Sequence, residues 1–255
     1  MPSWRVHRTI LSQALREVSG ELRALGEKFE EGLYRGVVEP DEVPDGVVKA
    51  RMGRRRTYFY IGHAKHHTVD ETLINYYYNL ALYYARRGRV LLSGVALGRA
   101  IHYAQDGSVK TRRFLILDEH ERVEKEIEEA LKSFEEGAWK YRRGAESSKK
   151  ASTQGLEALC IAYEKTSRIL KSFLAELTKP VDVEELRKRV QMIRGVKAGI
   201  AIASILVTLA AGNFLALAIA MLMSIVIALY RPKTYYEAMR AGLMVLKPYG
   251  FEPAY

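Results

Sequence analysis

The longest stretch of the chain without a charged residue lies near its C-terminus. It runs from Ala198 to Tyr230, and it consists mainly of Ala, Ile, Leu and Val without a single Asp, Glu, Lys or Arg. As one straight helix it would be ~50 Å long, whereas the hydrocarbon core of a bilayer is roughly 30 Å thick. The sequence AAGN at Ala210–Asn213 interrupts the run, because Gly and Asn favour helix ends. The segment therefore predicts two short apolar helices joined by a turn.

Basic residues flank this uncharged segment on both sides. They are Arg187, Lys188, Arg189, Arg194 and Lys197 before it, and Arg231, Lys233 and Arg240 after it. Because Lys and Arg are enriched on the cytoplasmic side of membrane segments, both ends of a hairpin would face the cytoplasm. Aliphatic runs of this length are rare in soluble cores. We therefore expect a membrane hairpin. A single span, a shallow re-entrant hairpin and a buried hairpin in a soluble oligomer are the alternatives.

The composition of the whole chain excludes several classes of protein. In 255 residues, 48% are hydrophobic and the formal net charge is +10, which excludes a disordered chain and favours anionic partners. The single Cys excludes a disulfide framework. The N-terminus lacks a signal-peptide pattern, and the low Asn and Gln content is typical of thermophilic proteins. A basic cluster, Lys49, Arg51 and Arg54–Arg56, suits phosphate binding, although a solvated loop is the favoured interpretation.

Apolar periodicity predicts an all-α fold, a helical bundle followed by the apolar hairpin. The first helix has one face made of His7, Leu11, Ala14, Val18, Leu22 and Leu25. Further helices are expected over 71–87 and 90–105, from 118 to beyond Trp139, over 152–177, and from a capping box at Asp182 and Glu185. Residues 34–68 are rich in turn-forming residues. No stretch alternates between apolar and polar residues as a strand does.

All six His lie in the first 120 residues, and two His–carboxylate pairs with a spacing of four positions lie on the expected helices. The pairs are His102 with Asp106 and His120 with Glu124. Residues four apart on a helix share a face, so both side chains of a pair can reach one ion. Both pairs lie on faces predicted to be buried, where a carboxylate is costly unless it is paired or bound to metal. Imidazole with carboxylate suits zinc and other divalent metals, so we favour metal binding over simple hydrogen-bonded pairs.

The sequence around the first pair resembles the zinc-dependent phospholipase C family. Leu97–Asp106 (LGRAIHYAQD) resembles the family's helix motif L-G-x-x-x-H-Y-x-x-D, whose His and Asp bind metal. Tyr76–Arg89 is similar to the helix and turn before that motif. His120–Glu124 (HERVE) is similar to the family's downstream His-x-x-x-Glu pair. The resemblance covers about half of the chain, Trp4–Glu124, and implies an all-helical metal site.

The resemblance also implies ligands upstream of the motif. Asp41, at the end of GLYRGVVEPD, matches a loop Asp, and His7 matches an early His on the first helix. One of three neighbouring His would match the loop His that follows. The complete implied set is His7, Asp41, one of His63, His66 and His67, then His102, Asp106, His120 and Glu124.

Two positions depart from the family pattern. The family has a further metal-binding His six residues after the helix Asp, where this chain has Arg112. The family also binds metal through the amine and carbonyl of an N-terminal Trp, whereas three residues precede Trp4. These departures favour a site with one or two zinc ions, or another divalent metal, over the family's three.

The expected chemistry follows from the implied metal. A bound divalent metal lowers the pKa of its water to about 7 and neutralises phosphate oxygens. Asp106 would bridge two ions, and Asp41 would act as a general base or a ligand. The predicted function is a metal-dependent, phospholipase C-like phosphodiester hydrolase. Its substrate would be a phospholipid headgroup or another phosphodiester, and its catalytic domain would be held at a membrane on the cytoplasmic side.

Two alternatives remain open at this point. Zinc-dependent single-strand nucleases are similar in fold and ligand order but end their set with His-x-x-x-Asp, so Glu124 disfavours nucleic acid as substrate. The other alternative is a non-enzymatic membrane protein that binds metal at a degenerate site. Arg112, which stands where the family has a ligand His, supports this alternative. In each case the expected parts are a metal-binding, hydrolase-like domain (1–150), additional helices (151–197), the membrane hairpin or span (198–230) and a basic tail (231–255).

Overall fold

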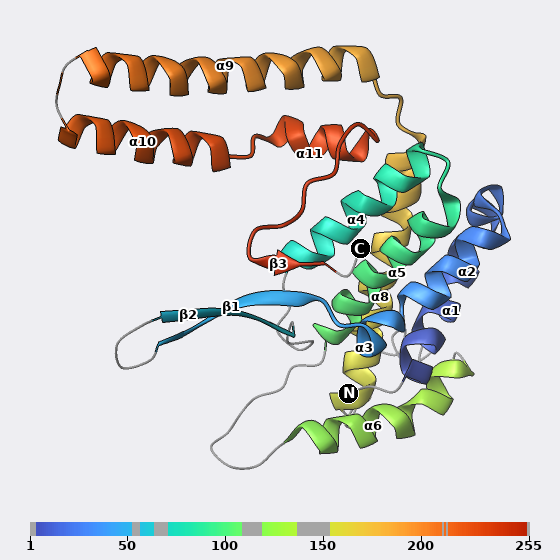
Figure 1. The fold of residues 1–255 in the computed structure, drawn as a ribbon. Coiled ribbons are helices and arrows are strands. Elements are labelled where there is room, and N and C mark those ends of the chain that lie inside the picture. Colours follow the sequence, from blue (N-terminus) through green and yellow to red (C-terminus); the bar gives the residue numbers. More distant parts are fainter. Residues whose placement is uncertain are drawn as a thin grey trace, which may run out of the picture. The chain divides into compact units, whose positions relative to one another are not determined.

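The computed structural model describes residues 4–52, 57–63, 71–108, 119–136, 154–210, 212 and 214–253 (Figure 1). These residues confirm the predicted all-α class, since helices dominate and strands form one small sheet. The chain divides into unit 1, Met1–Lys179 with Lys247–Tyr255, and unit 2, Pro180–Leu246. This division differs from the expected boundaries at 150, 197 and 230. The helix over 154–178 packs within unit 1, whereas residues 233–240 pack on the helix that begins at residue 183.

Unit 1 is mainly a bundle of helices. They are α1 (Trp4–Leu22), α2 (Glu27–Gly36), α3 (Glu39–Glu42), α4 (Glu71–Arg86), α5 (Val90–Asp106), α6 (Glu119–Glu135) and α8 (Gln154–Thr178), with a 3₁₀ helix at Arg23–Leu25. The helices predicted from periodicity are confirmed, except that α6 ends before Trp139, which lies outside the described residues. The periodicity did not predict α2 and α3. Each is too short to show a long apolar repeat, and α3 lies in the turn-rich segment.

Helix α5 is the centre of unit 1. Its residues from Ser93 to Asp106 are all buried, and α2, α4 and α8 pack around it. A helix that is apolar on every side is expected to be buried in this way. Gly88, with a φ of 70°, makes the tight turn that brings α4 back against α5. The burial of α5 places the two polar side chains near its end, His102 and Asp106, inside the protein.

Four glycines let α2 and α5 approach at backbone distance. They are Gly32 and Gly36 on α2, and Gly94 and Gly98 on α5. A Cβ on Gly36 would lie 2.1 Å from the carbonyl oxygen of Val95, and a Cβ on Gly94 would lie 2.2 Å from that of Phe29. Both separations are far below van der Waals contact, so only glycine permits this crossing.

Substituting Gly36→Ala is therefore expected to destabilise unit 1 by about 1–3 kcal/mol or more, because the added methyl overpacks two rigid backbones. Chemical denaturation followed by circular dichroism measures the change. Gly199→Ala is the matched control, because a Cβ there meets nothing within 4 Å and alanine is the better helix former. Equal stability of the Gly36→Ala variant and the native chain would contradict the close crossing.

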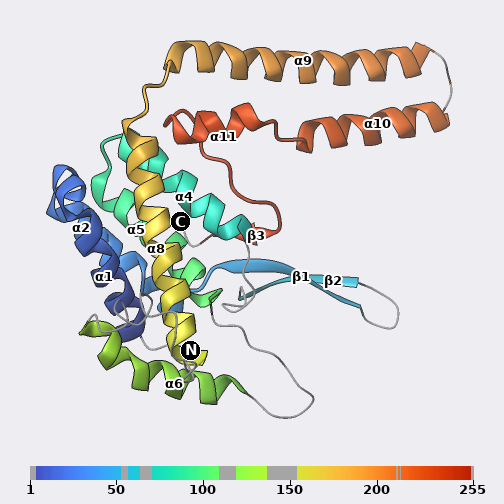
Figure 2. The ribbon, with the colours of Figure 1, turned by 180° about the vertical axis from the view of Figure 1, so that it is seen from behind.

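A three-stranded antiparallel sheet corrects the expectation that the chain has no strands. It consists of β1 (Gly46–Met52), β2 (Thr57–His63) and β3 (Phe251–Glu252) in the order β2-β1-β3. β1 and β2 lie in the segment predicted to be turns. Residues 58–61 are Tyr-Phe-Tyr-Ile, which favour strands without alternating in polarity, so the period-two pattern was missing. Figures 1 and 2 show the β1–β2 ribbon extending away from the helices of unit 1.

Unit 2 contains α9 (Val183–Ala210), α10 (Phe214–Leu229) and α11 (Lys233–Arg240). The predicted break is confirmed, because Gly212 takes a φ of 62° between α9 and α10. The predicted cap is also present, since the Glu185 amide donates to Asp182 Oδ1 at 2.9 Å. Two segments, Val183–Ala210 and Phe214–Arg240, are long and apolar enough to cross a membrane, and almost none of the residues in their most apolar windows are buried.

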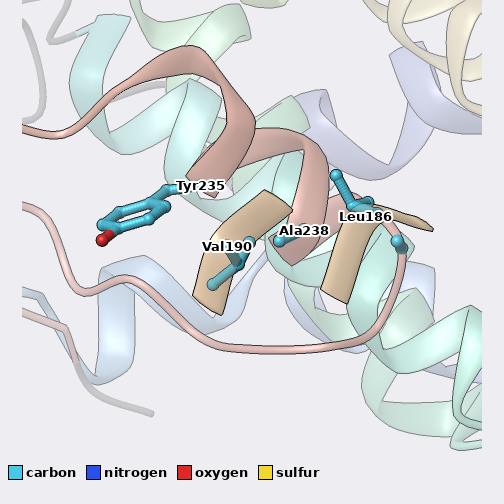
Figure 3. Close-up of a cluster of buried hydrophobic side chains, with 5 residues drawn as sticks. Leu186, Val190, Tyr235 and Ala238 are labelled. Carbon is cyan, nitrogen blue, oxygen red and sulfur yellow. The ribbon is translucent and has the colours of Figure 1, made fainter. Parts of the chain in front are cut away.

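The polar end of unit 2 has its own small core. Figure 3 shows Leu186 and Val190 of α9 beside Tyr235 and Ala238 of α11. Lys197 lies where the apolar part of α9 begins, and its ammonium is 5.2 Å from the ring of Tyr235. Lysine and tyrosine are the residues that mark membrane–water interfaces. The charged beginning of α9 packs against α11, whereas most apolar side chains of α9 and α10 are exposed or half-buried.

Candidate metal site

Unit 1 brings four of the predicted ligands together. They are His7 from α1, Asp41 from α3, and His102 and Asp106 from α5. Ligand atoms of His7, Asp41 and His102 all lie within 4.8 Å of one another, so this group can hold a metal ion. The side chains of His7, His102 and Asp106 are at most 2% exposed, whereas that of Asp41 is 19% exposed. Asp41 is therefore the member of the group that solvent reaches.

Asp106 lies between the two imidazoles. Its Oδ2 is 3.2 Å from Nε2 of His102, and its Oδ1 is 3.4 Å from Nε2 of His7. The two rings are 4.5 Å apart between centroids. Asp41 Oδ1 approaches His102 Nε2 at 3.8 Å. Both Nε2 atoms thus face carboxylate oxygens in a buried space.

The Nδ1 atom of His102 has its hydrogen-bond partner outside the cluster. Nδ1 of His102 is 2.9 Å from the carbonyl oxygen of Val37, at the end of α2. A carbonyl oxygen only accepts hydrogen bonds, so Nδ1 carries the proton and donates. In the neutral ring Nε2 then presents its lone pair to the cluster.

The ring of His7 is also oriented from outside the cluster, by a series of hydrogen bonds through Gln105 and Thr166. Gln105 Nε2 donates to Thr166 Oγ1 at 3.0 Å, and that hydroxyl donates to the carbonyl oxygen of Ala162 at 2.8 Å. The amide oxygen of Gln105 is therefore the acceptor at 2.7 Å from His7 Nδ1. His7 Nδ1 carries the proton, and its Nε2 also presents a lone pair inward. A metal-binding imidazole needs this outer hydrogen bond to fix its tautomer and ring plane.

The inner atoms of the cluster are all electron-rich. Lone pairs on two Nε2 atoms facing carboxylate oxygens repel one another unless a proton or a cation lies between them. Burial lowers the pKa of His102, but the hydrogen bond to Asp106 and the charges of Asp106 and Asp41 outweigh burial and raise it. A divalent cation would satisfy the same lone pairs without protonating the rings. The donor set therefore fits a metal ion.

A buried arginine holds the segment that carries Asp41. Arg99 of α5 is fully buried, and its Nε donates to Glu39 Oε2 at 3.2 Å. Its Nη1 donates to Asp45 Oδ1 at 3.0 Å, and its Nη2 donates to the carbonyl oxygen of Val43 at 2.9 Å. These three partners lie on both sides of Asp41 in the sequence. Arg99 thus fixes the position of Asp41 relative to α5.

Two tyrosines join Arg99 and its partners Glu39, Val43 and Asp45, and we call this group the Arg99 cluster. The hydroxyls of Tyr77 and Tyr103 each donate to one oxygen of Asp45 at 2.5 Å. Burial raises the pKa of both hydroxyls above its usual value, and the charge of Asp45 raises each pKa further. They remain protonated donors, so the Asp45 carboxylate keeps its partners. The sequence reasoning did not identify Arg99 as important, although a lone Arg within an apolar helix indicates a buried ion pair.

The remaining predicted ligands are only partly described. His120 and Glu124 lie on α6, as their spacing of four requires, and His63 ends β2, but the side chains of these three lie outside the described residues. His66, His67 and Arg112 also lie outside them. Their roles stay predictions. Trp4 begins α1 with 57% of its surface exposed, and the Arg8 guanidinium lies 5.2 Å from its ring.

Comparisons with protein-family models, curated proteins and solved structures find no match for this chain. The class of the site therefore follows from its own geometry. It is a buried cluster of two imidazoles and two carboxylates, with both imidazoles oriented by outer hydrogen bonds.

Metal binding tests this class directly. The native chain is expected to bind zinc, and His102→Ala is expected to lose that binding. Gln105→Leu is expected to weaken it about 10–100-fold, because the ring of His7 loses its outer acceptor. Competition with a chelator of known affinity measures each change. Gln13→Leu is the control, since Gln13 is also buried but donates to the Glu135 carbonyl away from the cluster. Equal zinc affinity in the two Gln variants would contradict the orienting role.

Arg99→Met is expected to cost about 3–5 kcal/mol of folding free energy, because Asp45 and Glu39 lose the cation that compensates their buried charge. Arg35→Met is the matched control. Arg35 donates to the other oxygen of Glu39, but its side chain is 61% exposed, so its loss is expected to cost about 0–1 kcal/mol. Urea unfolding compares the two variants. Similar losses in both would show that the buried cluster does not anchor the segment.

Proposed function

We propose that this chain is a membrane-associated, metal-dependent phosphodiester hydrolase of the phospholipase C type, and that zinc is its metal. One observation supports this most. Four residues that lie between positions 7 and 106 of the sequence gather around a single buried point: His7, Asp41, His102 and Asp106. They are four members of the ordered ligand set that the family resemblance implies.

The proposed chemistry assigns a task to each of these side chains. His7, His102 and Asp106 would bind metal through their inward atoms, with the rings held by Gln105 and Val37. When bound, a divalent metal supplies a water of lowered pKa and neutralises charge on the phosphate. Asp41, the most exposed member, is suited to take the proton of the attacking water.

The reaction is a displacement at phosphorus. The oxygen of the attacking water bonds to phosphorus, and the bond between phosphorus and the oxygen of the lipid glycerol breaks. The departing alkoxide takes up a proton, so the products are a phosphomonoester headgroup and a neutral alcohol. Asp41 takes the proton released by the water, and the alkoxide takes its proton from solvent, so the proton transfers balance.

Three features favour a lipid substrate at a membrane. The chain has a formal net charge of +10, and two of its helical segments are long and apolar enough to cross a membrane. Basic residues flank both ends of the hairpin, so the two ends would lie on the same, cytoplasmic side. Excess positive charge raises the local concentration of anionic headgroups and phosphates.

The decisive experiment is headgroup release from phospholipid vesicles by purified chain loaded with zinc. Asp41→Asn is expected to lower kcat about 10²–10⁴-fold through loss of the general base. Glu42→Gln, an exposed neighbour on the same helix, is the control and is expected to leave kcat unchanged. Cleavage of single-stranded DNA without headgroup release would select the nuclease alternative. Zinc-loaded chain that cleaves neither substrate would select the non-enzymatic one.

A further inference from the structure

The β1–β2 ribbon has one apolar face that is exposed. Val48 pairs with Ile61 and Ala50 pairs with Phe59, so these four side chains lie on the same side of the ribbon. Phe59 is 73% exposed, Ile61 is 64% exposed and Val48 is 49% exposed. We call these four residues the ribbon face. Large apolar groups exposed side by side are unusual on a soluble surface and mark an interaction site.

The C-terminal segment of unit 1 contacts only the beginning of the ribbon. β3 pairs with β1 at Gly46 and Val47, and the Val48 amide donates to the Gly250 carbonyl at 2.8 Å, so the ribbon is two-stranded beyond Val48 (Figures 1 and 2). A ribbon of two strands is marginally stable in water without a surface against which to pack. The exposed ribbon face is therefore suited to contact a further surface.

The charges of the ribbon indicate the chemistry of that partner. Its segment, 46–63, contains five Lys and Arg and no Asp or Glu. On the side opposite the ribbon face, Lys49 pairs with Tyr60, and the stem of Lys49 lies over Gly62. An apolar face with a lysine and a tyrosine behind it, on a segment rich in cations, is typical of elements that lie in the interface of an anionic bilayer.

We propose that the ribbon face is a membrane-contact surface that enters the interface of an anionic bilayer. A second copy of the chain is the less favourable occupant, because two such ribbons would bring like charges together. The same chain also carries two apolar helices that are long enough to cross a membrane, which favours a bilayer as the partner of the ribbon face.

This inference extends the proposed function and rests on it for the substrate. Gly46, where the ribbon starts, follows Asp41 by five residues, so the two lie at most about 18 Å apart along the chain. A ribbon held in the headgroup layer would keep the metal site within reach of lipid phosphates. The substrate class would then be a phospholipid presented in a bilayer, rather than a soluble phosphodiester.

A depth measurement tests the surface without using catalysis. Single cysteines are placed at Ile61 and at Tyr60, on opposite faces, in the full chain with Cys160→Ser. Each carries an environment-sensitive fluorophore, and the chain is reconstituted into vesicles containing anionic lipid. Quenching by a lipid-attached quencher is expected to be about threefold stronger at position 61, since interfacial elements lie ~5–10 Å into the headgroup and acyl boundary. Phe59→Cys is a second position on the same face.

The outcomes separate the two proposals. Stronger lipid quenching at positions 59 and 61 than at 60 supports the membrane-contact surface, even where no hydrolysis is detected. Equal and strong quenching of all three positions by aqueous iodide overturns it, whatever the enzymatic activity. Protection from iodide that depends on protein concentration, without lipid quenching, also overturns it in favour of contact between two copies.

Discussion

The backbone contact between α2 and α5 is the constraint on which the site depends. Glycine at four positions lets the two helices cross at a distance that no side chain would allow. This crossing brings the end of α2, with the Val37 carbonyl, against Nδ1 of His102. It also leads the chain into α3, where Arg99 holds the residues on both sides of Asp41. The candidate metal-binding group is therefore a consequence of close packing between two helices.

The two units meet different physical demands. Unit 1 buries charge, and the buried Arg99, Glu39 and Asp45 have specific partners, as has the oriented imidazole of His7. Unit 2 exposes aliphatic side chains along α9 and α10, and packs only its charged end against α11. Such a division suits a chain whose chemistry is done in one part and whose membrane association is provided by another.

Much of the site was predictable because its residues are polar where the sequence requires burial. His102 and Asp106 lie on the apolar face of a helix, and His7 begins the apolar face of another. The Arg99 cluster was not predicted, because its partners Glu39 and Asp45 lie in a segment without periodicity. The β1–β2 ribbon was not predicted either, because the alternating run Val48–Met52 is short and lies among turn-forming residues, and Tyr58–Ile61 does not alternate in polarity. The Arg99 bonds join residues 54 and 60 positions apart, which no local pattern records.

The sequence by itself determined the helical class, the break between two apolar helices and the residue types of the site, because apolar spacing and helix-breaking residues act locally. Only the tertiary structure decided which side chains meet. The convergence of His7, Asp41 and His102 depends on three helices packing at particular distances. The tautomers of both imidazoles depend on acceptors from other elements, Gln105 and Val37. Neither property has a local cause, because contacts between distant segments arise only when the core closes.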